Sequence, residues 1–385
     1  MHIKEAHPEV LEDNERVLWH YSAGQPGSVL VLLVGMHGNE PAGVKAVKKI
    51  SENQEFFQDR FYGDVYAIAG NLKALEKGVR FIDTDLNRLW ELFNTRKDYS
   101  KKNGAMKPVE YLESLDIKRV IEAIISRHSE SLEDIIFADL HTTSSQSCAF
   151  ILLNDTLANR ELAGNFPVPQ ILGIEENIQG TLLSFINNLG FRALGFEAGA
   201  HDDEISIIRS EAFLYLLLHY AGNTSLTNAE ERKYRDIIEV YENVPNTYYE
   251  VIYHKLVDDP AAFQMIKGFE NFLPVEKGTS LAYEHGSLIR APKSGRIFMP
   301  LYQKKGHDGF LIVREVSPFW LEVSGYLRRS SIHRLLRFLP GVTQTGPRSF
   351  EVDLNVARFL VKDIFHLLGY RVTEKNEFTL ICYRR

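Results

Sequence analysis

Residues 29–41 read VLVLLVGMHGNEP, and this stretch decides the fold. Its aliphatic half, Val29–Leu33, is typical of a buried strand in a parallel sheet that is covered on both faces. Gly35 ends the apolar run, so the strand delivers His37 and Glu40 to its carboxyl end. Ligands of open α/β sheets bind in the crevice outside the carboxyl ends of the strands. An imidazole and a carboxylate three residues apart at that place are ligand types that zinc accepts.

A His-x-x-Glu spacing is common, so a metal site also needs a third ligand from elsewhere in the chain. Between the first strand and that ligand, the pattern predicts a helix over 42–52, a strand over 64–69 and a helix over 116–127. A second buried-type strand over 134–143 then carries His141 near its end. Two histidines and one carboxylate, the third about a hundred residues beyond the first two, are the ligand set of a catalytic zinc with a position open for water.

Glu197 lies directly after an apolar strand predicted over 191–196, and small residues flank it. At the end of a strand, a carboxylate in such surroundings can take a proton from an attacking water and pass it to a leaving amine. The alternative is a glutamate that caps a helix or forms a salt bridge. Its place between the third ligand and the helix predicted over 206–221 favours the catalytic role.

Arg80, Asn87 and Arg88 lie on one loop that has neither helical nor strand periodicity. An arginine fork binds a carboxylate through two hydrogen bonds, and an amide adds a directional one, so Asn87 and Arg88 suit a substrate carboxylate. Arg80 would then face a polarised carbonyl or a second carboxylate. The alternative is a solvated loop in which the arginines form ion pairs with Asp83 and Asp85.

The composition narrows the classes of protein. A net charge of −7 argues against a general nucleic-acid binder. Two cysteines, Cys148 and Cys382, are too few for a disulfide framework and fit a reducing compartment. The first residues lack the apolar run of a signal peptide, and the longest apolar stretches are too short to span a bilayer. We therefore expect a cytoplasmic protein with no membrane or nucleic-acid partner.

With 385 residues the chain is too long for one average domain, and its pattern changes twice. Residues 1–240 alternate strands and helices, which predicts an α/β catalytic domain. Short strand-like pieces separated by Gly or Pro follow over 241–325 and predict a smaller β-rich domain. Residues 326–385 form an α+β extension whose role the sequence does not define. Its basic residues either face an anionic partner or a neighbouring subunit, or lie on a solvated helix face: Arg328, Arg329 and Arg337.

Four motifs, in this order, resemble the succinylglutamate desuccinylase and aspartoacylase family: Gly35–Glu40, Arg80–Arg88, Asp139–Thr142 and Gly195–Gly199. That family is related in fold to the zinc carboxypeptidases. The resemblance covers roughly residues 25 to 320. It implies an α/β fold with a zinc-carboxypeptidase-like mixed sheet flanked by helices, and a smaller β-rich domain that caps the active site.

The resemblance also implies one Zn²⁺ per chain, held by three side chains: His37, Glu40 and His141. Glu197 would be the general base, and Arg80 would polarise the scissile carbonyl. Asn87 and Arg88 would bind the substrate carboxylate. Tyr302 would contribute to the substrate pocket from the β-rich domain.

We therefore expect a zinc-dependent hydrolase that cleaves the amide bond of an N-acyl amino acid. The nucleophile would be a zinc-bound water, and the acyl group one such as succinyl or acetyl. The expected partner is this small-molecule substrate, and the sequence is compatible with a homo-oligomer. Two alternatives remain: a metallocarboxypeptidase acting on short peptides, and an inactive relative that binds a carboxylate ligand. The complete set of motif residues argues against the inactive relative.

Overall fold

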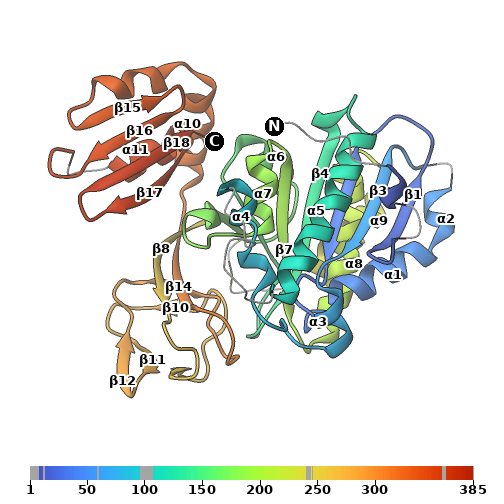
Figure 1. The fold of residues 1–385 in the computed structure, drawn as a ribbon, viewed down its shortest axis with the longest axis horizontal. Helices are drawn as coiled ribbons and strands as arrows, with labels where there is room; N and C mark the ends of the chain where they lie inside the picture. Colours follow the sequence, from blue (N-terminus) through green and yellow to red (C-terminus); the bar gives the residue numbers. More distant parts are fainter. Residues whose placement is uncertain are drawn as a thin grey trace.

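The computed structural model describes residues 8–11, 14–58, 60–95, 107–239, 244, 246–357 and 361–384. The boundary predicted between residues 240 and 241 lies outside these ranges. Within them the chain forms a mixed α/β structure with a large central sheet and two smaller sheets (Figure 1). This agrees with the predicted fold class.

The central sheet has 11 strands, and its middle is parallel. The pairs β3 with β2, β2 with β4 and β4 with β7 all run in the same direction, so their carboxyl ends meet at one edge of the sheet. In spatial order the strands are β1 (Val17–Ser22), β3 (Asp64–Ala69), β2 (Val29–Val34), β4 (Ile135–Thr143), β7 (Arg192–Ala200), β5 (Phe150–Leu153), β6 (Gln170–Leu172), β8 (Tyr248–Leu256), β14 (Asp308–Glu315), β13 (Gly295–Phe298) and β10 (Pro274–Val275).

Helices cover both faces of this sheet (Figure 1). All six residues of β2 are buried, and they alternate between two cores: Leu30, Leu32 and Val34 belong to one, and the odd-numbered residues to the other. The first core is closed by α1 (Ala42–Glu52), α8 (Glu204–Tyr220) and α9 (Asn228–Ile238), and the second by α5 (Val109–Arg127) and α7 (Leu182–Asn188). The burial of β2 on both faces explains its unbroken aliphatic sequence.

Short elements connect the strands and the long helices. They are the α-helices α2 (Gln54–Phe57), α3 (Leu72–Lys77), α4 (Glu91–Thr95) and α6 (Leu157–Ala163), and the 3-10 helices η1 (Pro8–Leu11), η2 (Leu86–Arg88), η4 (Leu132–Asp134) and η5 (Ile174–Glu176). Among the described residues, no helix has both the length and the apolar character needed to cross a membrane.

The β-rich segment continues the central sheet. β8 pairs in parallel with β6, and β14, β13 and β10 then follow by antiparallel pairing. A separate sheet of 3 strands stands beside them, in the order β12 (Ser287–Arg290), β11 (Ser280–Glu284) and β9 (Phe263–Met265). This segment has its own small core around Phe310, Ile312 and Leu281.

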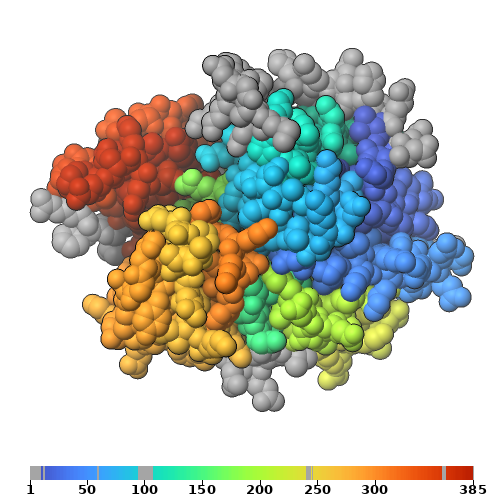
Figure 2. Space-filling model, turned by 60° about the horizontal axis from the view of Figure 1, so that its bottom comes forward, coloured from blue at the N-terminus to red at the C-terminus, as the bar shows by residue number. Residues whose placement is uncertain are grey.

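The extension forms a lobe at one end of the molecule, coloured red in Figures 1 and 2. Its sheet of 4 strands packs against helices around a core of its own, as expected for an α+β unit. The first element, α10 (Pro318–Arg329), runs through the boundary predicted between residues 325 and 326, so the lobe begins earlier than predicted. The other elements are η6 (Ile332–Phe338), α11 (Val361–Leu367) and, in sheet order, β15 (Val342–Gly346), β16 (Ser349–Asp353), β18 (Thr379–Arg384) and β17 (Tyr370–Asn376).

Arg328 corrects one expectation about the extension. Its side chain is 6% exposed, and its Nη2 lies 2.6 Å from Asp155 Oδ2. Nη1 also donates to the Asp155 carbonyl oxygen at 2.7 Å. Arg328 therefore does not lie on a solvated helix face, and it is not exposed for an anionic partner. It forms an ion pair that connects the extension to the α/β part. Arg329 and Arg337 are exposed, as expected for a solvated face.

Gly38 is required by close packing of the motif loop against α3. A Cβ at this position would lie 2.0 Å from both the carbonyl carbon and the oxygen of Ala74, which are backbone atoms that cannot move aside. Gly38→Ala is therefore expected to destabilise the protein by about 3 kcal/mol, which lowers Tm by about 6 °C or more in thermal unfolding.

Gly325→Ala is the matched control for this substitution. Gly325 lies in α10, where the nearest atom to an added Cβ is Arg329 Nη1 at 3.9 Å. The substitution is expected to leave Tm unchanged or raise it slightly, because alanine favours helix more than glycine does. A Gly38→Ala protein that melts with the wild type would show that the loop can move away from α3.

Candidate active site

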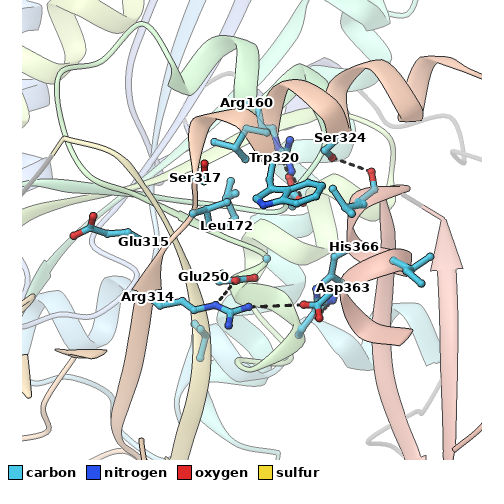
Figure 3. A pocket seen from close by; sticks show the side chains of 18 of the residues that line it. Arg160, Leu172, Glu250, Arg314, Glu315, Ser317, Trp320, Ser324, Asp363 and His366 are labelled. Carbon is cyan, nitrogen blue, oxygen red and sulfur yellow. Dashed lines mark hydrogen bonds and ion pairs between the residues drawn. The ribbon is translucent and has the colours of Figure 1, made fainter. Parts of the chain in front are cut away.

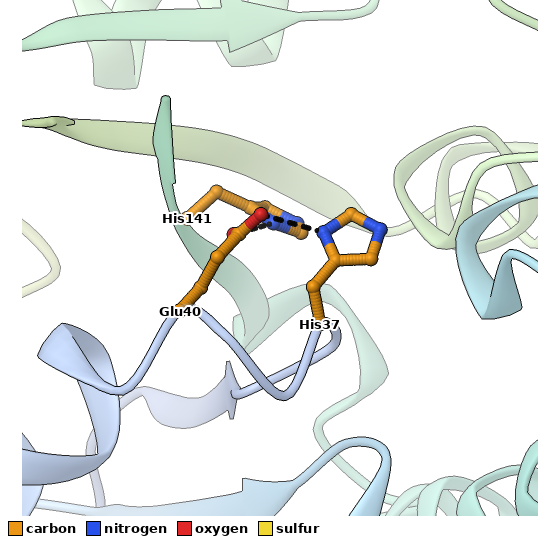
Figure 4. Close-up of side chains that lie close together, drawn as sticks. All are labelled: His37, Glu40 and His141. Atoms are coloured by element: carbon orange, nitrogen blue, oxygen red, sulfur yellow. Dashed lines mark hydrogen bonds and ion pairs between the residues drawn. The ribbon is translucent and has the colours of Figure 1, made fainter. Parts of the chain in front are cut away.

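Three buried side chains converge at the carboxyl edge of the parallel strands: His37, Glu40 and His141 (Figure 4). His37 follows β2, Glu40 immediately precedes the Pro41 N-cap of α1, and His141 lies near the end of β4, the neighbour of β2. His37 Nδ1 lies 2.8 Å from Glu40 Oε1, and His141 Nδ1 lies 2.9 Å from Glu40 Oε2. The structure thus brings the three predicted ligands together, and one ligand atom from each lies within 4.8 Å of the others.

A second carboxylate lies behind each histidine. Asp85 Oδ1 is 3.0 Å from His37 Nε2, and Asp139 Oδ2 is 3.0 Å from His141 Nε2. Both imidazoles therefore turn Nδ1 toward Glu40 while a carboxylate orients the opposite nitrogen. Histidines that bind zinc commonly donate their other ring nitrogen to a carboxylate in this way.

The charges of the cluster fit a divalent cation. Burial alone would raise the pKa of Glu40, but His37 and His141 hold it well below its ordinary value. For His141 burial acts in the opposite direction and alone would lower the pKa, but Asp139 and Glu40 raise it well above the ordinary value. The buried carboxylates thus favour positive charge between the two histidines. A divalent cation bound by both Nδ1 atoms and Glu40 would supply that charge.

Glu197 lies beside this cluster, because β7 runs parallel to β4 with Glu197 opposite His141 in the register. The side chain is buried, and its Oε2 has no hydrogen-bond partner within the described parts of the chain. Burial, with added repulsion from Glu40 and Asp139, raises the pKa of Glu197 to about 8. A buried carboxyl group with such a pKa and one oxygen free of described partners, beside a candidate metal site, is suited to proton transfer.

The raised pKa of Glu197 can be tested in metal-free protein. Glu197 has an ordinary pKa of 4.5 and a folded value of about 8, so the stability gained from its neutral form is complete below pH 4.5 and lost as the pH rises through 8. Gln mimics the neutral form at every pH. Glu197→Gln is therefore expected to raise Tm in chelator by about 2 °C or more above pH 8 and much less below pH 5. A Tm difference independent of pH would contradict the shifted pKa.

Arg80 lies at the rim of the cluster with its side chain 14% exposed. Its Nη2 is 3.0 Å from Asp85 Oδ2, and its Nη1 is 3.5 Å from Glu40 Oε1. The ion pair to Asp85 considered as an alternative from the sequence is therefore present. It does not place Arg80 in solvent, since Asp85 also contacts His37 and holds Arg80 against the candidate metal site.

Asn87 and Arg88, the predicted carboxylate clamp, already have partners within the protein. Asn87 Oδ1 accepts a hydrogen bond from the Leu182 amide at 2.8 Å. Arg88 Nη2 lies 2.6 Å from Asp308 Oδ2 at the start of β14. The Asn87 oxygen and the Arg88 guanidinium therefore both have partners within the protein, and the Asn87 amide nitrogen is the group that would donate to a substrate carboxylate.

Tyr302 lies apart from the arginines. Its hydroxyl contacts the backbone of Ile266 and Phe269, with both O–H···O distances at 3.0 Å. It lines a pocket of about 500 Å³ together with Thr143 and His201. A smaller adjoining pocket, of about 70 Å³, shares some of these residues and is lined by Arg80, Arg88, Thr142, Thr143, Ser144, Ser145, Ile178, His201, Met299, Pro300, Leu301, Gln303, Lys305, Gly306 and Asp308.

A larger cavity, of about 750 Å³, lies elsewhere, between the α/β part and the extension (Figure 3). Trp320 and Leu172 form part of its apolar wall, and Arg314 crosses it to reach Glu250 and Asp363. None of the site residues predicted from the sequence lines it. Two of the predicted site residues, Arg80 and Arg88, line the pocket of about 70 Å³ instead.

Three residues near the candidate site were not recognised from the sequence, namely Asp308, His254 and His201, whereas a fourth, Asp139, carried a signal. Asp308 and His254 meet only because β14 pairs with β8, and no local pattern marks either residue. His201 has no second candidate ligand near it in the sequence at a metal-binding spacing. In the structure its Nδ1 lies 2.7 Å from Thr142 Oγ1, and it lines both pockets near the cluster. Asp139, two residues before His141, had the one usable signal, because alternate residues of a strand share a face.

Comparison with known proteins points to the same family that the sequence motifs resemble. Residues 26–204 match the family model described as the succinylglutamate desuccinylase/aspartoacylase catalytic domain. The chain is 34% identical over 131 residues to aspartoacylase of Mus musculus, which is 34% of this chain and 39% of that protein. It is 29% identical over 116 residues to succinylglutamate desuccinylase of Pseudomonas paraeruginosa, which is 30% of this chain and 31% of that protein. The matched stretch therefore spans less than half of either relative.

Solved structures agree with the fold. The crystal structure of succinylglutamate desuccinylase/aspartoacylase from Rhodobacter sphaeroides superposes with a TM-score of 0.54 at 14% identity, covering 76% of this chain and 87% of that one. A succinylglutamate desuccinylase from Vibrio parahaemolyticus gives 0.54 at 16% identity, covering 77% and 84%. At these identities the likeness concerns the arrangement of helices and strands.

Proposed function

The chain belongs, through residues 26–204, to the succinylglutamate desuccinylase/aspartoacylase family, and on that premise we propose that it is a zinc-dependent amidohydrolase acting on an N-acyl amino acid. Its curated relatives are named aspartoacylase and succinylglutamate desuccinylase, both deacylases. The observation that carries the proposal is the convergence of two Nδ1 atoms on Glu40, beside a Glu197 Oε2 that has no hydrogen-bond partner among the described residues.

His37, Glu40 and His141 would hold the zinc, and Asp85 and Asp139 would orient the two imidazoles. When bound, zinc lowers the pKa of a water molecule and polarises a carbonyl group. Glu197 accepts the proton of the attacking water and delivers it to the leaving nitrogen. Arg80, held against Glu40 and Asp85, stabilises the negative charge that develops on the carbonyl oxygen.

The experiment that tests this function is hydrolysis of a panel of N-acetyl and N-succinyl amino acids and short peptides by zinc-loaded protein. Release of the free amino acid is expected, with loss of turnover in chelator and recovery on addition of zinc. Cleavage of peptides alone would favour the metallocarboxypeptidase. Bound zinc without any turnover would favour the inactive carboxylate-binding relative.

A further inference from the structure

Arg88 is occupied by a carboxylate of the protein itself. Its Nη2 donates to Asp308 Oδ2 at 2.6 Å, and its Nη1 donates to the carbonyl oxygen of Asn87 at 2.8 Å. Asp308 is 220 residues away in sequence, at the first position of β14. Two of the five N–H groups of Arg88 are thus engaged by acceptors of the chain, and one of these acceptors is an anion that neutralises the guanidinium charge.

Asp308 is held in place by more than Arg88. Its other oxygen, Oδ1, lies 2.9 Å from His254 Nε2, and the His254 side chain is 10% exposed. The backbone of Asp308 is fixed as well, because it pairs with Leu256 on β8. Burial would raise the pKa of Asp308, but hydrogen bonds from His254 and Arg88 hold it at about 2. Asp308 therefore remains a fixed anion at neutral pH.

This ion pair lies where a substrate would bind. Arg88 and Asp308 line the pocket of about 70 Å³ together with Arg80 and Thr142. The backbone amide of Thr142 donates to Glu40 Oε2 at 3.2 Å, so this pocket adjoins the candidate metal site. A substrate bound there for attack at its acyl carbonyl would extend toward Asp308.

The charge of Asp308 decides between the possible substrate groups. A substrate carboxylate would either meet the Asp308 anion at the same guanidinium or displace it from Arg88, leaving a partly buried anion with His254 as its remaining partner. Either event would weaken binding by about tenfold to a hundredfold. A carboxamide avoids that penalty, because its N–H can donate to a carboxylate that still has free lone pairs. Its carbonyl oxygen carries no charge to be repelled.

We propose that Asp308 is a specificity-determining residue that takes the place of a substrate carboxylate on Arg88, so that the substrate is an N-acyl amino acid whose carboxyl group is blocked as an amide. This inference rests on the proposed deacylase function and narrows its substrate class. It also assigns Arg88 a role different from the one predicted from the sequence: Arg88 holds Asp308.

The test compares matched acid and amide substrates, such as an N-acetyl amino acid and its carboxamide, with zinc-loaded wild type and Asp308→Asn. The wild type is expected to have a kcat/KM about tenfold or more higher for the amide. Asp308→Asn frees Arg88 and is expected to raise kcat/KM for the acid about tenfold or more. Adding Arg88→Gln to Asp308→Asn should abolish that gain, because the gain depends on the freed guanidinium.

Asp116→Asn is the matched control, since Asp116 forms an exposed ion pair with Arg119 on α5. It should leave the ratio of amide to acid unchanged. A wild type that prefers the acid, together with an Asp308→Asn variant that loses activity on it, would overturn the proposal and make Asp308 a support for a carboxylate-binding Arg88.

Calorimetric binding of the same acid and amide to zinc-loaded wild type separates this inference from the function. If neither compound is hydrolysed, the deacylase function fails, but tighter binding of the amide would still support the role of Asp308. Equal or tighter binding of the acid would overturn that role. The wild-type comparison needs no variant, so it holds even if Asp308→Asn does not fold.

Discussion

Glu197→Gln is expected to lower kcat on the preferred N-acyl substrate by about a thousandfold while the protein keeps its zinc. Gln has the size and shape of Glu but cannot accept the proton of the attacking water. Glu197 is not among the three clustered ligands, and its Oε2 lacks a partner in the described residues, so the substitution removes no visible support of the fold. The measurement is kcat beside zinc content by elemental analysis.

Glu122→Gln controls for the loss of one negative charge in the same part of the protein. Glu122 forms an ion pair with Lys118 on α5 and lines none of the three pockets described above. Its kcat should match that of the wild type. A Glu197→Gln protein that retains a tenth or more of wild-type kcat would assign proton transfer to another group, and His201 would be the next residue to replace.

His141→Ala is expected to abolish both zinc binding and turnover. The substitution removes one of three ligands and leaves Glu40 and Asp139 buried without the imidazole between them. Zinc affinity should fall by about a thousandfold or more, since a catalytic site with two protein ligands no longer fixes the ion. Competition with a chelating dye measures the affinity, and kcat is followed in parallel.

Asp139→Asn gives a graded version of the same test. It keeps the ligand His141 and weakens only the group that orients it, so zinc affinity is expected to fall by about ten- to a hundredfold. His333→Ala, at a histidine of the extension, should bind zinc as the wild type does. Full zinc affinity in His141→Ala would mean that the metal, if present, is bound by other residues.

The strands and helices of the α/β part could be predicted closely because short stretches of sequence determine them. The unbroken aliphatic sequence of β2 follows from burial on both faces, and α1 begins and ends where the sequence predicts. The meeting of His37 and His141 follows from one rule, that parallel strands end at the same edge of the sheet. The candidate ligand set therefore needed only the order of the strands, not their detailed packing.

The contacts that modify the site could not be predicted in this way. The pairing of Arg88 with Asp308 depends on how β14 packs against η2, and these two elements are 220 residues apart in sequence. The same holds for Arg328 and Asp155, which are 173 residues apart. From the sequence alone, an arginine can be interpreted either as a solvent-exposed cation or as part of a ligand-binding site. Only the tertiary structure shows which carboxylate is its partner.

The parallel pairing of β6 with β8 has a practical consequence for dividing the protein into parts. A truncated chain ending near residue 240 would retain β6 but lose the strand that covers it. The backbone N–H and C=O groups of Gln170–Leu172 would then form an open sheet edge, and such edges recruit strands from other molecules. A catalytic fragment made this way would tend to aggregate, even though the candidate zinc ligands and Glu197 all precede the cut.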